Sequence, residues 1–155
     1  MRAKPNKCYC LRPPRLRFFY VYCMGTLHEL DRTLLQAIGA IEALLALPCC
    51  DVAELSRIRY QTARAVAARR RAMDLLFNGA MAEGGARAEA VQSLRAGNFE
   101  MRMFYTDHTI AWPTARAVAE WPAYVAASRK LAAVIRRQVA VERALLYPEQ
   151  PRVDA

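Results

Sequence analysis

Apolar residues recur at steps of three and four along most of this chain, which is the spacing of amphipathic α-helices. The first such stripe is formed by Leu27, Leu30, Leu34, Ile38, Ile41 and Leu45. The second is formed by Leu55, Ile58, Thr62, Val66, Arg69 or Arg70, Met73 and Leu76. No stretch shows the period of two that a half-buried strand requires. The pattern therefore predicts an all-helical protein.

Capping residues predict where three of the helices begin. Thr26 is followed three residues later by Glu29, and Asp51 by Glu54, so each pair matches a capping box. Proline is well tolerated in a first helical turn, so Pro122 indicates the start of the last helix. These positions give the expected starts of the first, second and fourth helices.

Glycine and asparagine residues predict where helices end or break. Asn78-Gly79 favours a left-handed turn that ends the second helix, and residues 80–86 follow as a loop. The third helical region spans residues 87–112, with a break near Ala96-Gly97 and a new cap at Asn98. Four helices with short or medium links are typical of an up-down-up-down four-helix bundle.

The formal net charge of +9 is unevenly distributed along the chain. Residues 1–23 contain basic residues and no acidic one, whereas the remainder is nearly balanced. We therefore interpret residues 1–23 as a basic leader outside the fold, either an arm or a mis-assigned start. The bundle is expected to occupy residues 24–148, and residues 149–155 form a polar tail.

The most apolar stretch, residues 18–27, is too short to span a bilayer, so no transmembrane segment is expected. The five cysteines lack the spacing of a disulfide framework, which indicates reduced thiols. Both features favour a cytoplasmic protein.

The two halves of the helical pattern have a similar design. Each half has a helix with one histidine, followed by a helix with two polar residues spaced by four. Such a pair lies on one helical face. In chain order these residues are His28, then Arg70 and Asp74, then His108, then Gln138 and Glu142. His28 and His108 are the only histidines in the chain.

This arrangement resembles the hemerythrin-like (HHE cation-binding) family over about residues 26–148. The resemblance rests on the two histidines, the two spaced pairs and the ending from Glu142 to Tyr147-Pro148. It implies a four-helix bundle with a di-iron site that binds oxygen or senses iron or redox state. Arg70 and Gln138 stand where the family has histidines, which predicts that the di-iron site is lost.

Two interpretations of the remnant site follow from the resemblance. His28, Asp74, His108 and Glu142 could hold a single iron or zinc ion. In the favoured interpretation, Arg70 and Gln138 form a polar core network in place of the metal, and no cofactor is bound. An alternative orientation exposes Arg70 and turns Arg69 or Ala72 inward.

Aromatic residues suggest a different kind of site. Tyr105, Trp112 and Tyr124 are spaced to pack in the core, and beside a polar remnant they could line a small-molecule pocket.

A third hypothesis concerns the arginines of the second helix. Arg57, Arg64 and Arg71 are seven residues apart and share one stripe that could contact phosphates. Acidic residues are mixed among them, so nucleic acid is disfavoured as a partner.

The chain has no nucleophile elbow, no phosphate-binding loop and no Ser-His-Asp pattern. We therefore expect a non-catalytic binding, sensory or interaction module with a protein or small-molecule partner. The pattern indicates no particular oligomeric state.

Overall fold

The computed structural model describes residues 15–146, and it describes side chains from Thr26 onward except that of Arg87. The described chain is helical apart from its turns, which confirms the all-helical prediction. Its helices are α1 (Arg15–Leu44), α2 (Val52–Glu83), α3 (Gly85–Ala111), α4 (Thr114–Ala119) and α5 (Trp121–Leu146).

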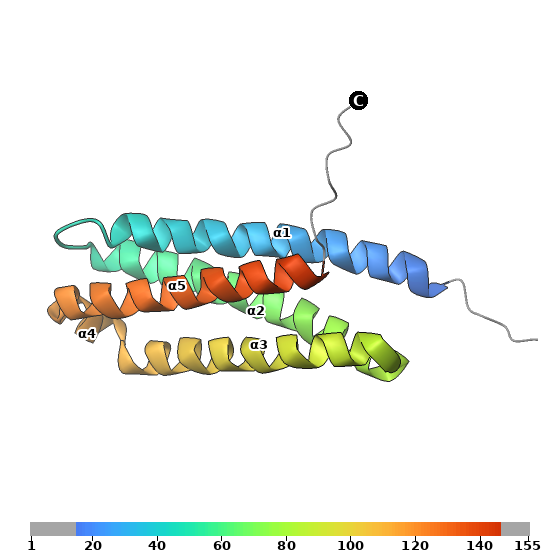
Figure 1. Cartoon of the computed structure of the whole chain (residues 1–155). Helices are drawn as coiled ribbons and strands as arrows, with labels where there is room; N and C mark the ends of the chain where they lie inside the picture. Colours follow the sequence, from blue (N-terminus) through green and yellow to red (C-terminus); the bar gives the residue numbers. More distant parts are fainter. Residues whose placement is uncertain (1–14, 147–155) are drawn as a thin grey trace, which may run out of the picture.

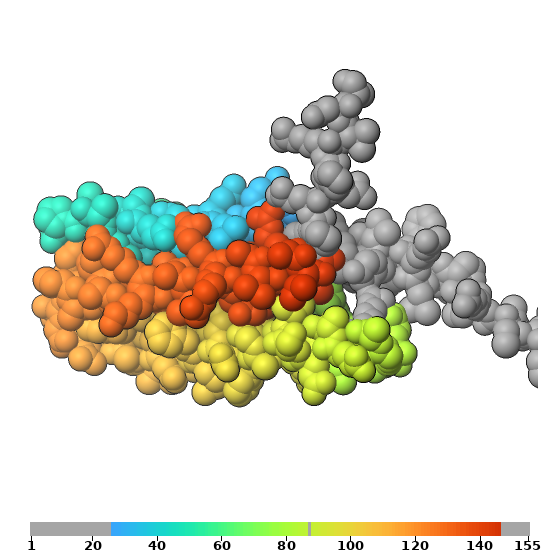
Figure 2. All heavy atoms as spheres, viewed as in Figure 1, coloured from blue at the N-terminus to red at the C-terminus, as the bar shows by residue number. Residues whose placement is uncertain are grey.

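The four long helices lie side by side, and consecutive long helices run in opposite directions (Figure 1). Helix α1 packs on α2, α2 on α3, α3 on α5, and α5 on α1, so the four enclose a common core. On the face seen in Figure 2, α5 lies between α1 and α3. The short helix α4 packs against α5 and α2.

The first helix begins earlier than the sequence predicts. Helix α1 already begins at Arg15, so the helix start predicted at Thr26 is wrong. The helix runs without interruption across the boundary predicted between residues 23 and 24. Residues 1–14 of the predicted leader and the polar tail 149–155 lie outside the described residues.

The start of α2 is confirmed, whereas its end is not. Asp51 Oδ1 accepts a hydrogen bond of 2.9 Å from the backbone N–H of Ala53, as an N-cap should. The stop predicted at Asn78-Gly79 is wrong, because α2 continues to Glu83. The chain reverses at Gly84 instead, where φ is 71° and a side chain would be strained.

The predicted break in the third helix and the predicted start of the last long helix have different outcomes. Helix α3 is continuous, so the predicted break at Ala96-Gly97 is wrong. Asn98 is buried in the core and caps no helix. Helix α5 begins at Trp121, which puts Pro122 in its first turn as predicted.

Three groups of buried apolar residues follow one another along the bundle. One group, with Leu44, Leu55 and Trp121, lies near the α1–α2 turn. A central group is built around Leu34, Ile38, Leu131, Ile135 and Val139. A third group contains Leu27, Met73, Phe77, Val91 and Leu94. Within the part of the chain that is described, no helix is both long and apolar enough to cross a membrane.

Candidate functional site: a buried polar layer and a pocket

Among the described side chains, each of the four long helices contributes one charged or amide side chain to the buried interior. These residues are Asp31, Arg69, Asn98 and Glu142, and each is at most 2% exposed. Each lies between a residue of the central apolar group and one that packs in the third group, as Asp31 lies between Leu27 and Leu34. The four side chains therefore form a polar layer between two apolar layers.

The polar layer is held together by charged hydrogen bonds. Arg69 Nε donates to Asp31 Oδ1 at 2.5 Å, and Arg69 Nη2 donates to Glu142 Oε2 at 2.5 Å. Glu142 Oε1 accepts from Asn98 Nδ2 at 2.9 Å and from Gln138 Nε2 at 2.8 Å. Gln138 thus joins the four residues named above, and we define the polar layer as these five residues. One glutamate thus connects α5 to both α2 and α3.

Two carboxylates share one guanidinium in this layer. Burial raises the pKa of Asp31, because the loss of solvation outweighs the attraction of Arg69 and the proximity of Glu142 acts in the same direction. Asp31 Oδ2 is buried and has no hydrogen-bond partner among the described residues. The layer is therefore tightly coupled, and removal of its single cation would leave acidic groups without a partner.

Gly97 provides the space that Gln138 occupies. A Cβ atom at residue 97 would lie 2.7 Å from Gln138 Oε1 and 3.0 Å from its Nε2. This glycine lies inside α3, where it leaves room for the amide that donates to Glu142. Its role is close approach between helices, which replaces the predicted helix break.

Gln138 belongs to the polar layer, but Arg70 does not. The Arg70 side chain is 55% exposed and lies 3.7 Å from the Asp74 carboxylate. The guanidinium that faces the core is that of Arg69. The structure therefore adopts the alternative orientation, in which Arg70 is exposed and Arg69 is turned inward. Arg102 also contacts Asp74, at 3.2 Å.

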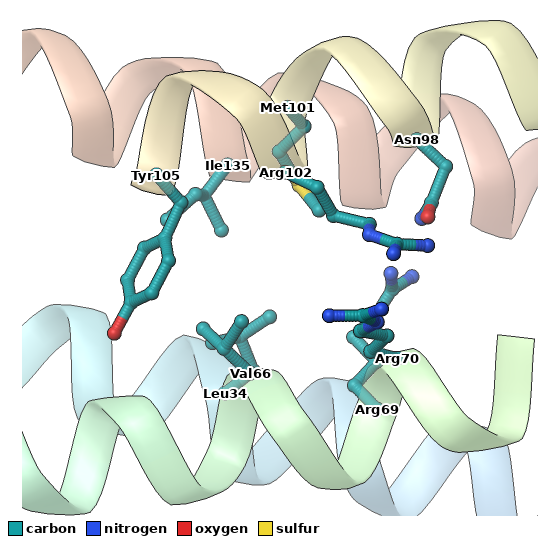
Figure 3. Close-up of a pocket in the computed structure, with 9 residues that line it drawn as sticks. All are labelled: Leu34, Val66, Arg69, Arg70, Asn98, Met101, Arg102, Tyr105 and Ile135. Atoms are coloured by element: carbon teal, nitrogen blue, oxygen red, sulfur yellow. The ribbon is translucent and has the colours of Figure 1, made fainter. Parts of the chain in front are cut away.

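Figure 3 shows Arg69, Arg70 and Arg102 around a small cavity beside Asn98. The volume of this cavity is about 10 Å³, which is room for about one water molecule. It is too small for an organic ligand.

The four residues considered as metal ligands occupy separate environments. His28 is exposed on α1, and Asp74 is 44% exposed on α2. Glu142 is in the polar layer, whereas His108 is half-buried near Ser128. In the described part of the chain, no three His, Cys, Asp or Glu side chains are grouped closely enough to hold a metal.

A larger cavity of about 220 Å³ lies next to the central apolar group. Tyr105 and Tyr124 line it, as expected from the sequence. Trp112 is not part of its lining but packs edge-on against Tyr124, with ring centroids 5.7 Å apart. All four long helices contribute walls, including Ile38 from α1 and Arg59 from α2. We refer to this cavity as the aromatic pocket.

The aromatic pocket contains one cation and one histidine. Ser128 Oγ and His108 Nε2 lie 3.3 Å apart. Arg59 Cζ lies 5.9 Å from the centre of the Tyr124 ring. Burial, together with the positive charge of Arg59, lowers the pKa of His108. At the pH where a free histidine would be half protonated, His108 is therefore protonated to a smaller extent.

This lowered pKa predicts a pH dependence of stability. The unfolded chain binds a proton at His108 near the ordinary pKa of 6.5, whereas the folded protein does so only at lower pH. The contribution of His108 to the free energy of unfolding is therefore present above the unfolded pKa of 6.5 and is lost as the pH falls toward the folded pKa. In urea unfolding between about pH 7.5 and 5, a His108→Gln variant should lose less stability than the wild type. Identical pH profiles would contradict this assignment.

The three arginines of the predicted anion-binding stripe are all exposed on α2. Arg57 is bound by Glu54, with Nη2 and Oε1 2.6 Å apart. Arg64 lies over the exposed Tyr60 ring, at 5.9 Å from its centre. One member of the stripe is thus already neutralised by a carboxylate on its own helix.

The sequence pattern did not predict Asp31 in the polar layer or Arg59 in the aromatic pocket. A signal for Asp31 was present, because it lies four residues after Leu27 and three before Leu34, on the apolar stripe. Arg59 follows Ile58 directly and gives no comparable signal.

Comparisons of the chain with protein-family models, curated proteins and solved structures found no match.

Proposed function

We propose that this protein is a non-catalytic binding module built on a four-helix bundle of hemerythrin-like design. In this proposal an ion-pair layer stands where the family has its metals, and the aromatic pocket binds a small molecule. The observation that carries the proposal is the cavity of about 220 Å³ whose walls come from all four long helices. Mainly apolar cavities with a few converging polar groups are the usual form of small-molecule sites.

The side chains of the polar layer support the proposal that the di-iron site of the family is lost. Arg69 places a permanent cation between Asp31 and Glu142, the two carboxylates that reach the centre of the bundle. A metal ion there would have to compete with the guanidinium for the same oxygen atoms and would be repelled by its charge. The remaining donors are two amides, which already bind Glu142.

The contact between Ser128 and His108 supports binding more than nucleophilic catalysis. An activated serine needs a histidine whose second ring nitrogen is oriented by a third group, such as a carboxylate. Among the residues that the structure describes, the polar side chain that contacts His108 is Ser128, and the nearby charge is the cation of Arg59. A cation disfavours the protonated imidazole that a general base must form.

A test of the proposed function uses small neutral and charged aromatic fragments with the full-length protein. Fragments that bind should shift the NMR signals of the His108 ring, because this ring lines the pocket. Ala63 also lines the pocket but is exposed, so an Ala63→Trp variant should cover the edge of the pocket and weaken binding.

Ala67→Trp is the matched control, since Ala67 is exposed on the same helix and does not line the aromatic pocket. This variant should bind fragments as the wild type does. If no fragment of any charge shifts the His108 signals, the proposed function is wrong.

A further inference from the structure

Among the described residues, the lining of the aromatic pocket has a single formal charge, and that charge is positive. Arg59 is the only Arg or Lys among the pocket residues, which include no Asp or Glu. Arg59 Nη1 is buried and has no hydrogen-bond partner among the described residues. A buried donor without a partner is destabilising, and more so when it is charged. The lining of the pocket thus contains an unsatisfied cationic side chain.

Three other arginines of the bundle have carboxylate partners, unlike Arg59. Arg69 is paired with two carboxylates, Arg57 with Glu54, and Arg136 with Glu42. Arg59 instead lies near the face of the Tyr124 ring. A ring face attracts a cation but leaves its N–H groups free to bind an anion in the ring plane of the guanidinium.

The rest of the pocket suits an apolar body. Ile38, Leu131, Tyr105 and Tyr124 contribute apolar surface to its walls. A cavity of about 150 Å³ holds benzene, so the volume of about 220 Å³ admits a six-membered ring that carries one small substituent.

We propose that the aromatic pocket binds a small aromatic carboxylate, with the carboxylate on the Arg59 guanidinium and the ring between Tyr105, Tyr124 and Leu131. This inference rests on the proposed function and names the ligand class of the same pocket. The planar guanidinium matches a carboxylate with two parallel hydrogen bonds. A single cation balances a monoanion, whereas a phosphate dianion would carry an excess negative charge into an apolar cavity.

Two neighbouring groups support this charge assignment. Burial and the charge of Arg59 lower the pKa of His108, which disfavours a second positive charge in the pocket. Burial raises the pKa of Tyr105, so its phenol stays protonated.

The test measures binding of benzoate to the full-length protein by calorimetry, with benzamide as a neutral analogue of the same shape. Benzoate should bind at least about tenfold more tightly than benzamide, and Arg59→Met should remove this difference. Arg64→Met is the matched control, because Arg64 is exposed on the same helix and lies outside the pocket. It should change benzoate affinity by no more than about twofold.

A second measurement does not depend on the variants. Benzoate should shift the NMR signals of the His108 ring in the wild-type protein and leave those of His28 unchanged, because only His108 lines the pocket. A shift of both histidines, or of His28 alone, would place the anion elsewhere and overturn the inference.

The possible outcomes separate the inference from the proposed function. If benzamide binds as tightly as benzoate and shifts His108, the pocket binds small molecules but the carboxylate assignment is wrong. Tighter binding of phenyl phosphate than of benzoate would overturn the monoanion assignment in the same way. If neither benzoate nor benzamide nor any other aromatic fragment shifts His108, the proposed function is wrong as well.

Discussion

Replacing Arg69 with methionine should lower the free energy of unfolding by about 3–5 kcal/mol, the range seen when one partner of a buried ion pair is removed. Methionine is similar in length and is compatible with the apolar neighbours Ala65 and Met73 on the same face of α2. The loss arises because Asp31 and Glu142 would keep their buried positions without a cation. Urea unfolding followed by circular dichroism measures the change.

Arg70→Met is the matched control for this prediction. Arg70 is adjacent in sequence, but its side chain is 55% exposed and its contact with Asp74 is 3.7 Å long. Exposed ion pairs of this kind contribute about 0–1 kcal/mol, so the control should be close to the wild type. Equal losses for the two variants would show that the polar layer is not organised around Arg69.

Replacing Tyr124 with alanine should lower the free energy of unfolding by about 3–5 kcal/mol, as for other large aromatic residues in cores. Tyr124 is 2% exposed and contacts the rings of His108, Trp112 and Trp121, with centroid distances of 5.6 to 5.7 Å. Its removal would open the wall between the aromatic pocket and the core beside the α1–α2 turn. Urea unfolding again measures the effect.

Two controls separate packing from chemistry in this second prediction. Tyr124→Phe keeps the ring and removes only the hydroxyl group, so it should change stability by about 1 kcal/mol or less. Tyr60→Ala removes a ring that is 65% exposed on α2, and it should have a small effect. A loss for Tyr60→Ala as large as that for Tyr124→Ala would contradict the assignment of Tyr124 to the core.

The helix boundaries show how local and tertiary signals compete. The Asp51 cap was predictable because the side chain binds an amide only two residues away. The end of α2 was not, because burial of Phe77 and Ala80 keeps the helix packed beyond Asn78. Packing of a buried face contributes more to helical stability than intrinsic propensity does.

The sequence predicted a polar network in the core, but it did not predict every residue of that network. Glu142 and Gln138 were placed together because a spacing of four puts them on one helical face, and the structure joins them at 2.8 Å. The choice between Arg69 and Arg70 could not be made from the pattern. Neighbouring residues on a helix point about 100° apart, and Arg69 and Arg70, three and four residues after Val66, both continue the apolar spacing of the sequence.

The sequence by itself determined that the protein is helical and where most of its buried stripes lie, because the spacing of apolar residues acts within each helix. Only the tertiary structure decided that Arg69 faces the core, that Asn98 binds Glu142, and that Arg59 lines a pocket whose described residues include no carboxylate. These outcomes depend on side chains that other helices bring to the same place. The physical reason is that a buried charge is oriented by its partners, and those partners are distant in the sequence.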